Sequence, residues 1–127
     1  MATAPIFVAT PKIALSTVTT ANTARDGTGT LTTAFTAGAN GSRVERITVT
    51  ASVTTAAGTI TIFVSDGTNN RLYREITVLV TTASTTSPAW SGTVSLGLIL
   101  PAGYSVKVGT NVATGQPFNV VIEGGDF

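Results

Sequence analysis

Apolar and hydroxyl-bearing side chains alternate along much of this chain. The clearest stretch is Arg43 to Val53, where threonine or serine separates the apolar side chains from Ile47 onward. Because successive side chains of a β-strand point to opposite faces, this pattern predicts a strand with one buried face and one hydroxylated face. Thr59 to Val64 continues the pattern, but here Phe63 falls on the side opposite the isoleucines. We therefore expect Phe63 to be buried on the outer side of its sheet, under a neighbour.

Strand patterns recur about every ten to fifteen residues, each bounded by glycine, proline, asparagine or aspartate. This spacing is typical of a β-sandwich and excludes alternating strands and helices. The segment from Ser65 to Asn70 predicts a hairpin loop, because its residues tolerate positive φ. The eight predicted strands are Ile13 to Thr19, Thr30 to Thr36, Arg43 to Val53, Thr59 to Val64, Leu72 to Val80, Trp90 to Leu100, Tyr104 to Gly109 and Phe118 to Glu123.

Eight antiparallel strands in one all-β domain predict a jelly-roll sandwich. An immunoglobulin-like sandwich uses nearly the same number of strands and remains the alternative, since strand order cannot be read from one sequence. Residues 1–11 hold two prolines around the apolar Ile6, Phe7 and Val8. They predict an extended N-terminal arm that packs on a partner, with a frayed terminus as the alternative. The jelly-roll domain then spans residues 12–127.

The composition points to a surface that hydroxyl groups or neighbouring subunits cover. Threonine accounts for 26 of the 127 residues, and charged residues make up 10% of the chain, where about 25% is usual for soluble domains. Thirteen charged side chains form a sparse coat for a free monomer. We expect burial in an assembly to cover part of this surface; a monomer hydrated by its threonines is the alternative.

The charge distribution argues against two classes of partner. The net charge is +1 and the seven basic residues are dispersed, so no basic run exists to follow a phosphate backbone. We expect no nucleic-acid partner. The N-terminus lacks the pattern of a signal peptide, and the most apolar run, Leu96 to Leu100, is interrupted by Gly97 and stopped by Pro101. We expect no membrane partner either.

Side chains that carry catalysis are scarce. The chain has no histidine and no cysteine, so a catalytic triad cannot be built. Asp26 and Asp66 each begin an Asp-Gly-Thr turn, and Glu45 and Glu75 stand next to arginines, which predicts weak surface ion pairs. We expect no enzyme activity and no cofactor.

Metal and modification sites have simpler interpretations. The loop from Asp66 to Asn70 offers oxygen ligands without the spacing of a calcium-binding loop, so turn chemistry is the better interpretation and no metal is expected. Gly124 and Gly125 match no phosphate-binding motif and are interpreted as tail residues, with Asp126 beside them. Asn40, Gly41 and Ser42 match a glycosylation sequence, but a tight turn before a strand explains them better.

Carbohydrate binding is the main alternative function, because jelly rolls often host it and aromatic side chains are its usual platform. The chain offers Trp90, Tyr73 and Tyr104 for this purpose. Trp90 follows Pro88 at the start of a predicted strand, where it could equally anchor the core or an interface.

Turn and strand-end motifs occur in five segments that together span nearly the whole chain. The segments are Ala21 to Gly29, Phe35 to Arg43, Val64 to Asn69, Leu100 to Tyr104 and Gly124 to Phe127. In combination they resemble the small jelly-roll cement or decoration proteins of tailed-bacteriophage capsids, although such motifs say nothing about a ligand.

The resemblance implies a structural virion protein on the outer capsid surface. Such a protein assembles as a homo-oligomer and clamps neighbouring subunits of the major capsid protein, and a trimer is slightly favoured over a dimer by analogy with proteins that occupy local symmetry axes. A head-fibre or tail protein that binds a carbohydrate receptor is the alternative. The residues expected at protein interfaces are Ile6, Phe7, Val8, Phe63 and Trp90.

Overall fold

The chain folds as an all-β protein. The computed structural model describes residues 8–111 and 117–127, and within them every helix-or-strand element is a strand. The eight strands are β1 (Thr10–Val18), β2 (Thr32–Thr36), β3 (Ser42–Ala51), β4 (Gly58–Ser65), β5 (Asn70–Val78), β6 (Ser91–Leu100), β7 (Ser105–Thr110) and β8 (Phe118–Asp126). The prediction of eight antiparallel strands is confirmed.

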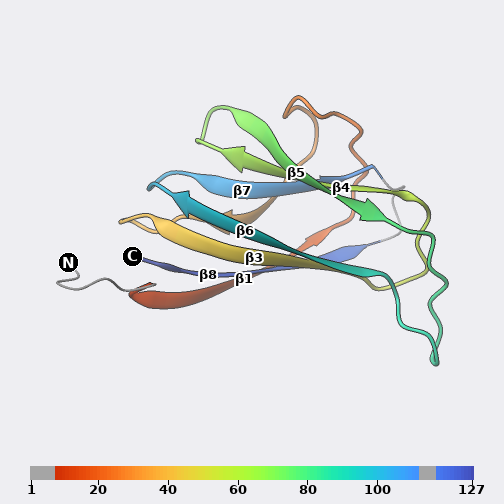
Figure 1. The fold of residues 1–127 in the computed structure, drawn as a ribbon. Helices are drawn as coiled ribbons and strands as arrows, with labels where there is room; N and C mark the ends of the chain where they lie inside the picture. Colours follow the sequence, from red (N-terminus) through yellow and green to blue (C-terminus); the bar gives the residue numbers. More distant parts are fainter. Residues whose placement is uncertain (1–7, 112–116) are drawn as a thin grey trace.

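The strands form two four-stranded sheets that face each other (Figure 1). One sheet has the order β1-β8-β3-β6 and the other the order β2-β7-β4-β5, and all the strand pairs are antiparallel. The short connections 37–41, 66–69 and 101–104 lie at one end of the sandwich. The longer connections 52–57 and 79–90 lie at the opposite end (Figure 1).

The core lies between the sheets and is built from the alternating apolar positions. Ile47 of β3 and Ile62 of β4 are fully buried, as their patterns predict. Trp90 packs edge-to-face on Phe118, with ring centroids 5.9 Å apart and an interplanar angle of 87°. Because threonine and the β-branched aliphatics are stiff at χ1 and fit a pleated surface, the sequence favours strands over helices throughout.

Several strand ends differ from the sequence prediction. The last strand continues through Gly124, Gly125 and Asp126, which pair with Lys12, Pro11 and Thr10 and are therefore not a tail. A Cβ on Gly124 would lie 2.0 Å from the Arg43 carbonyl oxygen, beside a bulge in β3. Only glycine permits this close approach of two backbones, so glycines that read as a terminus belong to a strand.

The third and fifth strands are shorter than predicted at their C-terminal ends. β3 stops at Ala51 and β5 at Val78, which leaves Val53 and Val80 outside the sheets and exposed. β1, in contrast, begins at Thr10, so the last two residues of the predicted arm belong to a strand. Residues 1–7 lie outside the described part of the chain.

Candidate interaction surfaces

The outer faces of the two sheets differ in what lies over them. On the sheet β2-β7-β4-β5, Thr61 and Phe63 of β4 point away from the core, opposite Gly109 and Lys107 of β7. Phe63 is nevertheless 0% exposed. We call this outer face the covered face, because the connection 19–31 lies against it.

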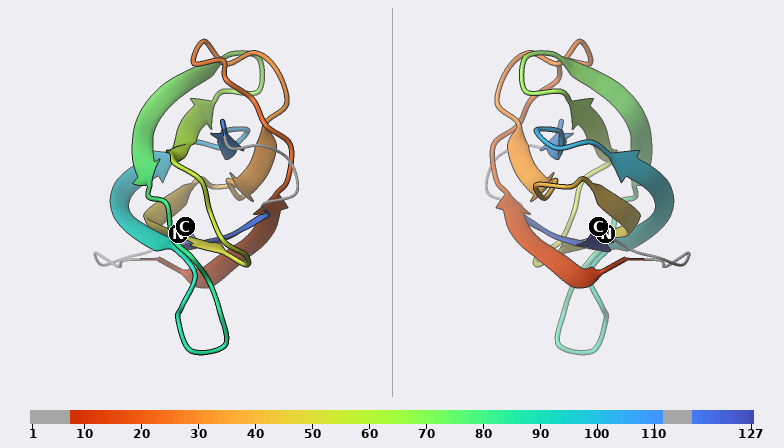
Figure 2. Two further views of the ribbon diagram at one scale, coloured as in Figure 1. Left: turned by 90° about the vertical axis from the view of Figure 1, so that its right-hand side faces the viewer. Right: turned by 90° about the vertical axis from the view of Figure 1, so that its left-hand side faces the viewer.

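Hydrogen bonds hold the connection 19–31 to the covered face. The Asn22 amide N–H donates to the Thr110 carbonyl at 2.7 Å, and the Asn70 side chain donates to the Gly27 carbonyl at 3.0 Å. Arg25 forms an ion pair with Glu75 of β5. In Figure 2 this segment, in orange, arches over the green β4-β5 hairpin. The sequence prediction that Phe63 is buried on the outer side is confirmed, and the neighbour that covers it is this chain's own connection.

Side-chain hydrogen bonds shape the connection itself. Asn22 Nδ2 donates to the carbonyls of Thr28 and Thr30, while the Ala24 amide donates to Asn22 Oδ1. The Thr28 hydroxyl and amide both donate to Asp26 Oδ1, which lowers the pKa of Asp26 below its ordinary value. The predicted Asp-Gly-Thr turn at Asp26 is confirmed.

The outer face of the sheet β1-β8-β3-β6 is the opposite case, and we call it the open face. Six of the fifteen side chains named here carry hydroxyl groups, and all fifteen are exposed or half-buried. The members are Pro11, Ile13, Leu15 and Thr17 of β1, Asn119, Val121 and Glu123 of β8, Arg43, Arg46, Thr48 and Thr50 of β3, and Ser91, Thr93, Ser95 and Ile99 of β6. The hydroxyls of Thr48 and Thr93 hydrogen-bond across the strands at 3.2 Å.

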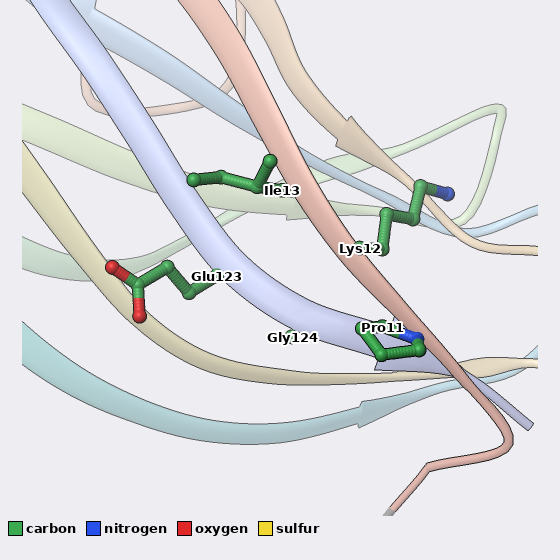
Figure 3. Close-up of a pocket in the computed structure, with 5 residues that line it drawn as sticks. All are labelled: Pro11, Lys12, Ile13, Glu123 and Gly124. Atoms are coloured by element: carbon green, nitrogen blue, oxygen red, sulfur yellow. The ribbon is translucent and has the colours of Figure 1, made fainter.

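An apolar strip runs along the β1 side of the open face. Ile13 is 61% exposed and Leu15 is 74% exposed, and Leu15 lies directly across from half-buried Val121. Next to the strip is a shallow depression lined by Pro11, Lys12, Ile13, Glu123 and Gly124 (Figure 3). Figure 3 shows Ile13 and Glu123 leaning to one side of the sheet and Lys12 to the other. The strip is thus an uncovered pair of large aliphatic side chains on a hydroxylated surface.

Two ion pairs join residues that are far apart in the sequence, and not the oppositely charged residues that are adjacent in the sequence. Glu75 pairs with Arg25 and not with the adjacent Arg74, and Arg46 pairs with Glu123 at 2.8 Å and not with the adjacent Glu45. Adjacent residues of a strand point to opposite faces, which separates such neighbours. These pairs are largely exposed and contribute little stability, but the second one leaves the centre of the open face without net charge.

The end of the sandwich that carries the longer connections forms a second candidate surface. The connections 52–57 and 79–90 contain no charged residue. Thr55 and Thr81 bridge them through two backbone hydrogen bonds of 3.0 and 3.3 Å. Leu79 is 62% and Val80 is 70% exposed, and Val53 is also exposed. We call this uncharged surface, with its three exposed aliphatic side chains, the loop end.

A polar cluster joins the two sheets at the edge where β1 lies near β2. Lys12 Nζ donates to the Thr36 carbonyl, lies 3.4 Å from Asp126 Oδ1, and sits 4.7 Å from the centroid of the Phe35 ring. Ser42 donates a hydrogen bond to Asp126, and this bond, together with the Lys12 ammonium group, lowers the pKa of Asp126. The cluster joins the ends of four strands, β1, β2, β3 and β8, which indicates a structural role.

The predicted interface residues do not gather in one place. Ile6 and Phe7 lie outside the described residues. Val8 is half-buried and packs against Gly125, where a Cβ would approach it to 2.6 Å. Phe63 is enclosed by its own chain, and Trp90 is 7% exposed within the core, so neither presents a surface to a partner. Phe63 and Trp90 therefore stabilise the fold of their own chain and do not form the interface that the sequence predicted.

Sequence analysis missed the residues that are most exposed. Ile13 and Leu15 alternate with smaller residues in a predicted strand and were interpreted as part of an ordinary pattern, while Leu79 and Val80 continue the apolar run of β5. A signal was present in both cases. Ile13 and Leu15 of β1 are aliphatic where most outward positions of β3 and β6 carry threonine or serine, and a polar connection follows Val80 at once.

Among the described residues, no helix is long and apolar enough to span a bilayer. No three aspartate, glutamate, histidine or cysteine side chains of this part of the chain are grouped as metal ligands would be. A scan against protein-family models matches no family, and a search of curated proteins gives no match.

Proposed function

We propose that this chain is a structural virion protein that binds the outer surface of a bacteriophage capsid as a homo-oligomer and cements neighbouring subunits of the major capsid protein. The observation that carries the proposal is the loop end. Two connections with eighteen residues and no charge place Val53, Leu79 and Val80 at one end of a rigid sandwich. Burial of uncharged surface requires no desolvation of ions, so such an end suits permanent docking on another protein.

The proposal includes a jelly-roll fold. The orders β1-β8-β3-β6 and β2-β7-β4-β5 support it, because every connection except the β4–β5 hairpin passes from one sheet to the other. The jelly rolls of many viral capsid domains are eight-stranded double sheets. Fold alone does not establish function, and here it supports the proposal only together with the surface.

The sparse charge supports the same function. The accessible surface of 6725 Å² carries thirteen charged side chains, which is about one charge per 520 Å². A cement protein stabilises a shell by burying area across subunit boundaries, and a surface of this kind can be buried at low desolvation cost. Several weak contacts from one oligomer act together through effective concentration, and a ligand that binds only the assembled shell stabilises it by its binding free energy.

Carbohydrate binding is less well supported. The aromatic side chain proposed as its platform, Trp90, packs on Phe118 within the core. Tyr73 is partly exposed, but its hydroxyl donates a hydrogen bond to the Leu96 carbonyl at 3.0 Å, and this links the two sheets at the edge opposite β1. Both aromatic groups therefore have structural partners.

Decoration of shells tests the proposal. We expect purified phage particles to contain the protein in hundreds of copies, and shells without it to break at a lower temperature. Added back to such shells, the wild-type chain should restore the breakage temperature and Val80→Glu should not. Ala102→Glu, which places the same charge on the exposed connection 101–104 at the opposite end of the sandwich, is the matched control for docking. Absence from mature particles, or about a dozen copies per particle, would overturn the proposed function.

A further inference from the structure

We propose that the open face is the self-association surface of this protein, and that a second copy of the same chain covers it around a two-fold axis. The inference rests on four features of that face: its apolar strip, its neutral charge, its area and its shape. Each is a property of described residues.

The strip supplies the apolar area that a subunit interface requires. Ile13 and Leu15 are aliphatic side chains of which 61% and 74% remain exposed, and half-buried Val121 extends the apolar surface from the edge strand β1 onto β8. Interfaces between subunits combine buried apolar side chains with polar ones. The polar part of the open face includes the threonine and serine hydroxyls of β3 and β6, which hydrogen-bond equally well to water or to another hydroxyl.

The charges of the open face are compatible with a copy of itself. Arg46 and Glu123 lie side by side at its centre, 2.8 Å apart, and cancel each other. A face with an excess of one sign would repel its own copy, whereas this arginine and glutamate leave the centre of the face without net charge. A second copy therefore meets no net electrostatic repulsion there.

The area is close to what a stable dimer requires. Four strands spaced about 4.8 Å apart, each nine or ten residues long at about 3.3 Å per residue, give a flat area of roughly 600 Å². Side chains make the accessible area of a pleated face larger than its flat area, and a standard interface buries about 800 Å² per partner. The whole open face, and not the strip alone, therefore has about the area that a dimer interface requires.

The shape of the molecule selects the symmetry. Figure 2 shows the connection 79–90 extending beyond the outer side of the sheet β1-β8-β3-β6. A two-fold axis that crosses the strands places one strip over the other and sets the two 79–90 connections at opposite ends, so that they do not collide. A three-fold axis would need the open face to meet a different face, since only a two-fold axis joins a surface to itself. We therefore propose a dimer, where the resemblance favours a trimer.

This inference deepens the proposed function, because it assigns the open face to oligomerisation and leaves both loop ends free for the capsid. The two proposals fail separately. Self-association is measured on the isolated full-length chain, whereas the cement function is measured on shells.

The test is the mass of the full-length protein in solution. We expect light scattering coupled to size-exclusion chromatography, at about 100 μM chain, to give the mass of two chains. Leu15→Glu should reduce it to one chain, because a carboxylate within the interface, between the two apolar strips, would be buried without a partner. Val80→Glu is the matched control, since Val80 is 70% exposed at the loop end, and it should remain a dimer. A wild-type monomer, a trimer, or equal loss of mass in both variants would overturn the inference.

A second measurement avoids dependence on a variant that fails to fold. The chain has no cysteine, so Leu15→Cys and Val80→Cys each introduce a single thiol. With a short bifunctional maleimide, Leu15→Cys should give a cross-linked dimer and Val80→Cys should stay single. Circular dichroism and the melting temperature of both variants should match those of the wild-type chain. Cross-linking through position 80 and not through position 15 would contradict the proposed arrangement.

Discussion

The open face and the covered face begin from similar sequence patterns and end in different environments. Both belong to four-stranded antiparallel sheets whose inner faces fill the same core. On the covered face, Phe63 is buried by the chain's own connection 19–31, whereas on the open face Leu15 remains 74% exposed. The difference shows that an outward apolar side chain can be satisfied in two ways: by a segment of the same chain or, as we propose, by another molecule.

The comparison also separates folding from association. An outward residue enclosed by its own chain contributes to the free energy of unfolding of the monomer. An outward residue left for a partner contributes little until the partner binds. Substitutions on the covered face should therefore change the free energy of unfolding of the monomer, and substitutions on the open face should change association.

The largest expected effect is that of Phe63→Ala. Removal of a fully buried phenylalanine leaves a cavity under the connection 19–31, so the free energy of unfolding should fall by about 3 to 5 kcal/mol. Denaturant unfolding measures it. Leu15→Ala on the open face should change the stability of the monomer by less than about 0.5 kcal/mol. Similar losses from both variants, at a concentration where the protein is monomeric, would erase the distinction between the faces.

A smaller effect of opposite sign is expected for Thr61→Val. The Thr61 hydroxyl is buried on the covered face, beneath the connection 19–31, and has no hydrogen-bond partner among the described residues. Replacement of the hydroxyl by a methyl group of similar size removes an unsatisfied polar group, so the free energy of unfolding should rise by about 1 kcal/mol. Thr48→Val, at a half-buried position of the open face, should be neutral. A loss of stability in Thr61→Val would show that water reaches the Thr61 hydroxyl and that the connection 19–31 does not exclude solvent from it.

The smallest effect concerns acid and compares Asp126, at the end of β8 in the sheet of the open face, with Asp26, in the connection 19–31. Their hydrogen bonds lower the pKa of both carboxyl groups below the ordinary value of 3.8. A lowered pKa in the folded state means stability that is complete above the ordinary value and is lost as the pH falls through the lowered one. Stability should therefore decrease slightly below about pH 4.

The variants Asp126→Asn and Asp26→Asn should each flatten part of this decline in urea unfolding between pH 2 and pH 6. We expect Asp126→Asn to flatten it more, because Asp126 has both Ser42 and Lys12 as partners. An unchanged pH dependence in both variants would place the acid-sensitive groups elsewhere.

The sequence predicted most of the fold because alternation is a local property. Ile47, Ile62 and Val78 fell on the buried side of their strands, and turn residues at Asp26, Gly41 and Asp66 marked the connections correctly. The strand ends were less certain. Gly124 and Gly125 read as a tail because glycine breaks local patterns, and only the bulge in β3 beside them explains why glycine is needed in a strand.

The candidate surfaces could not be predicted in the same way. Phe63 was recognised as outward, but the sequence did not say whether its neighbour was another segment or another molecule. Trp90 was assigned to an interface or to the core with equal reason, and its contact with Phe118 decided for the core. Ile13 and Leu15 read as ordinary strand residues until the sheet order placed β1 at an edge with its outward side bare.

The sequence by itself determined that this protein is all-β, that its surface is rich in hydroxyl groups and poor in charge, and that no histidine or cysteine is available for chemistry. These are properties of composition and of near neighbours along the chain. Only the tertiary structure decided which outward side chains the connection 19–31 encloses and which remain exposed. That outcome depends on contacts between residues far apart in sequence, such as Arg25 with Glu75 and Gly27 with Asn70, which no local pattern encodes.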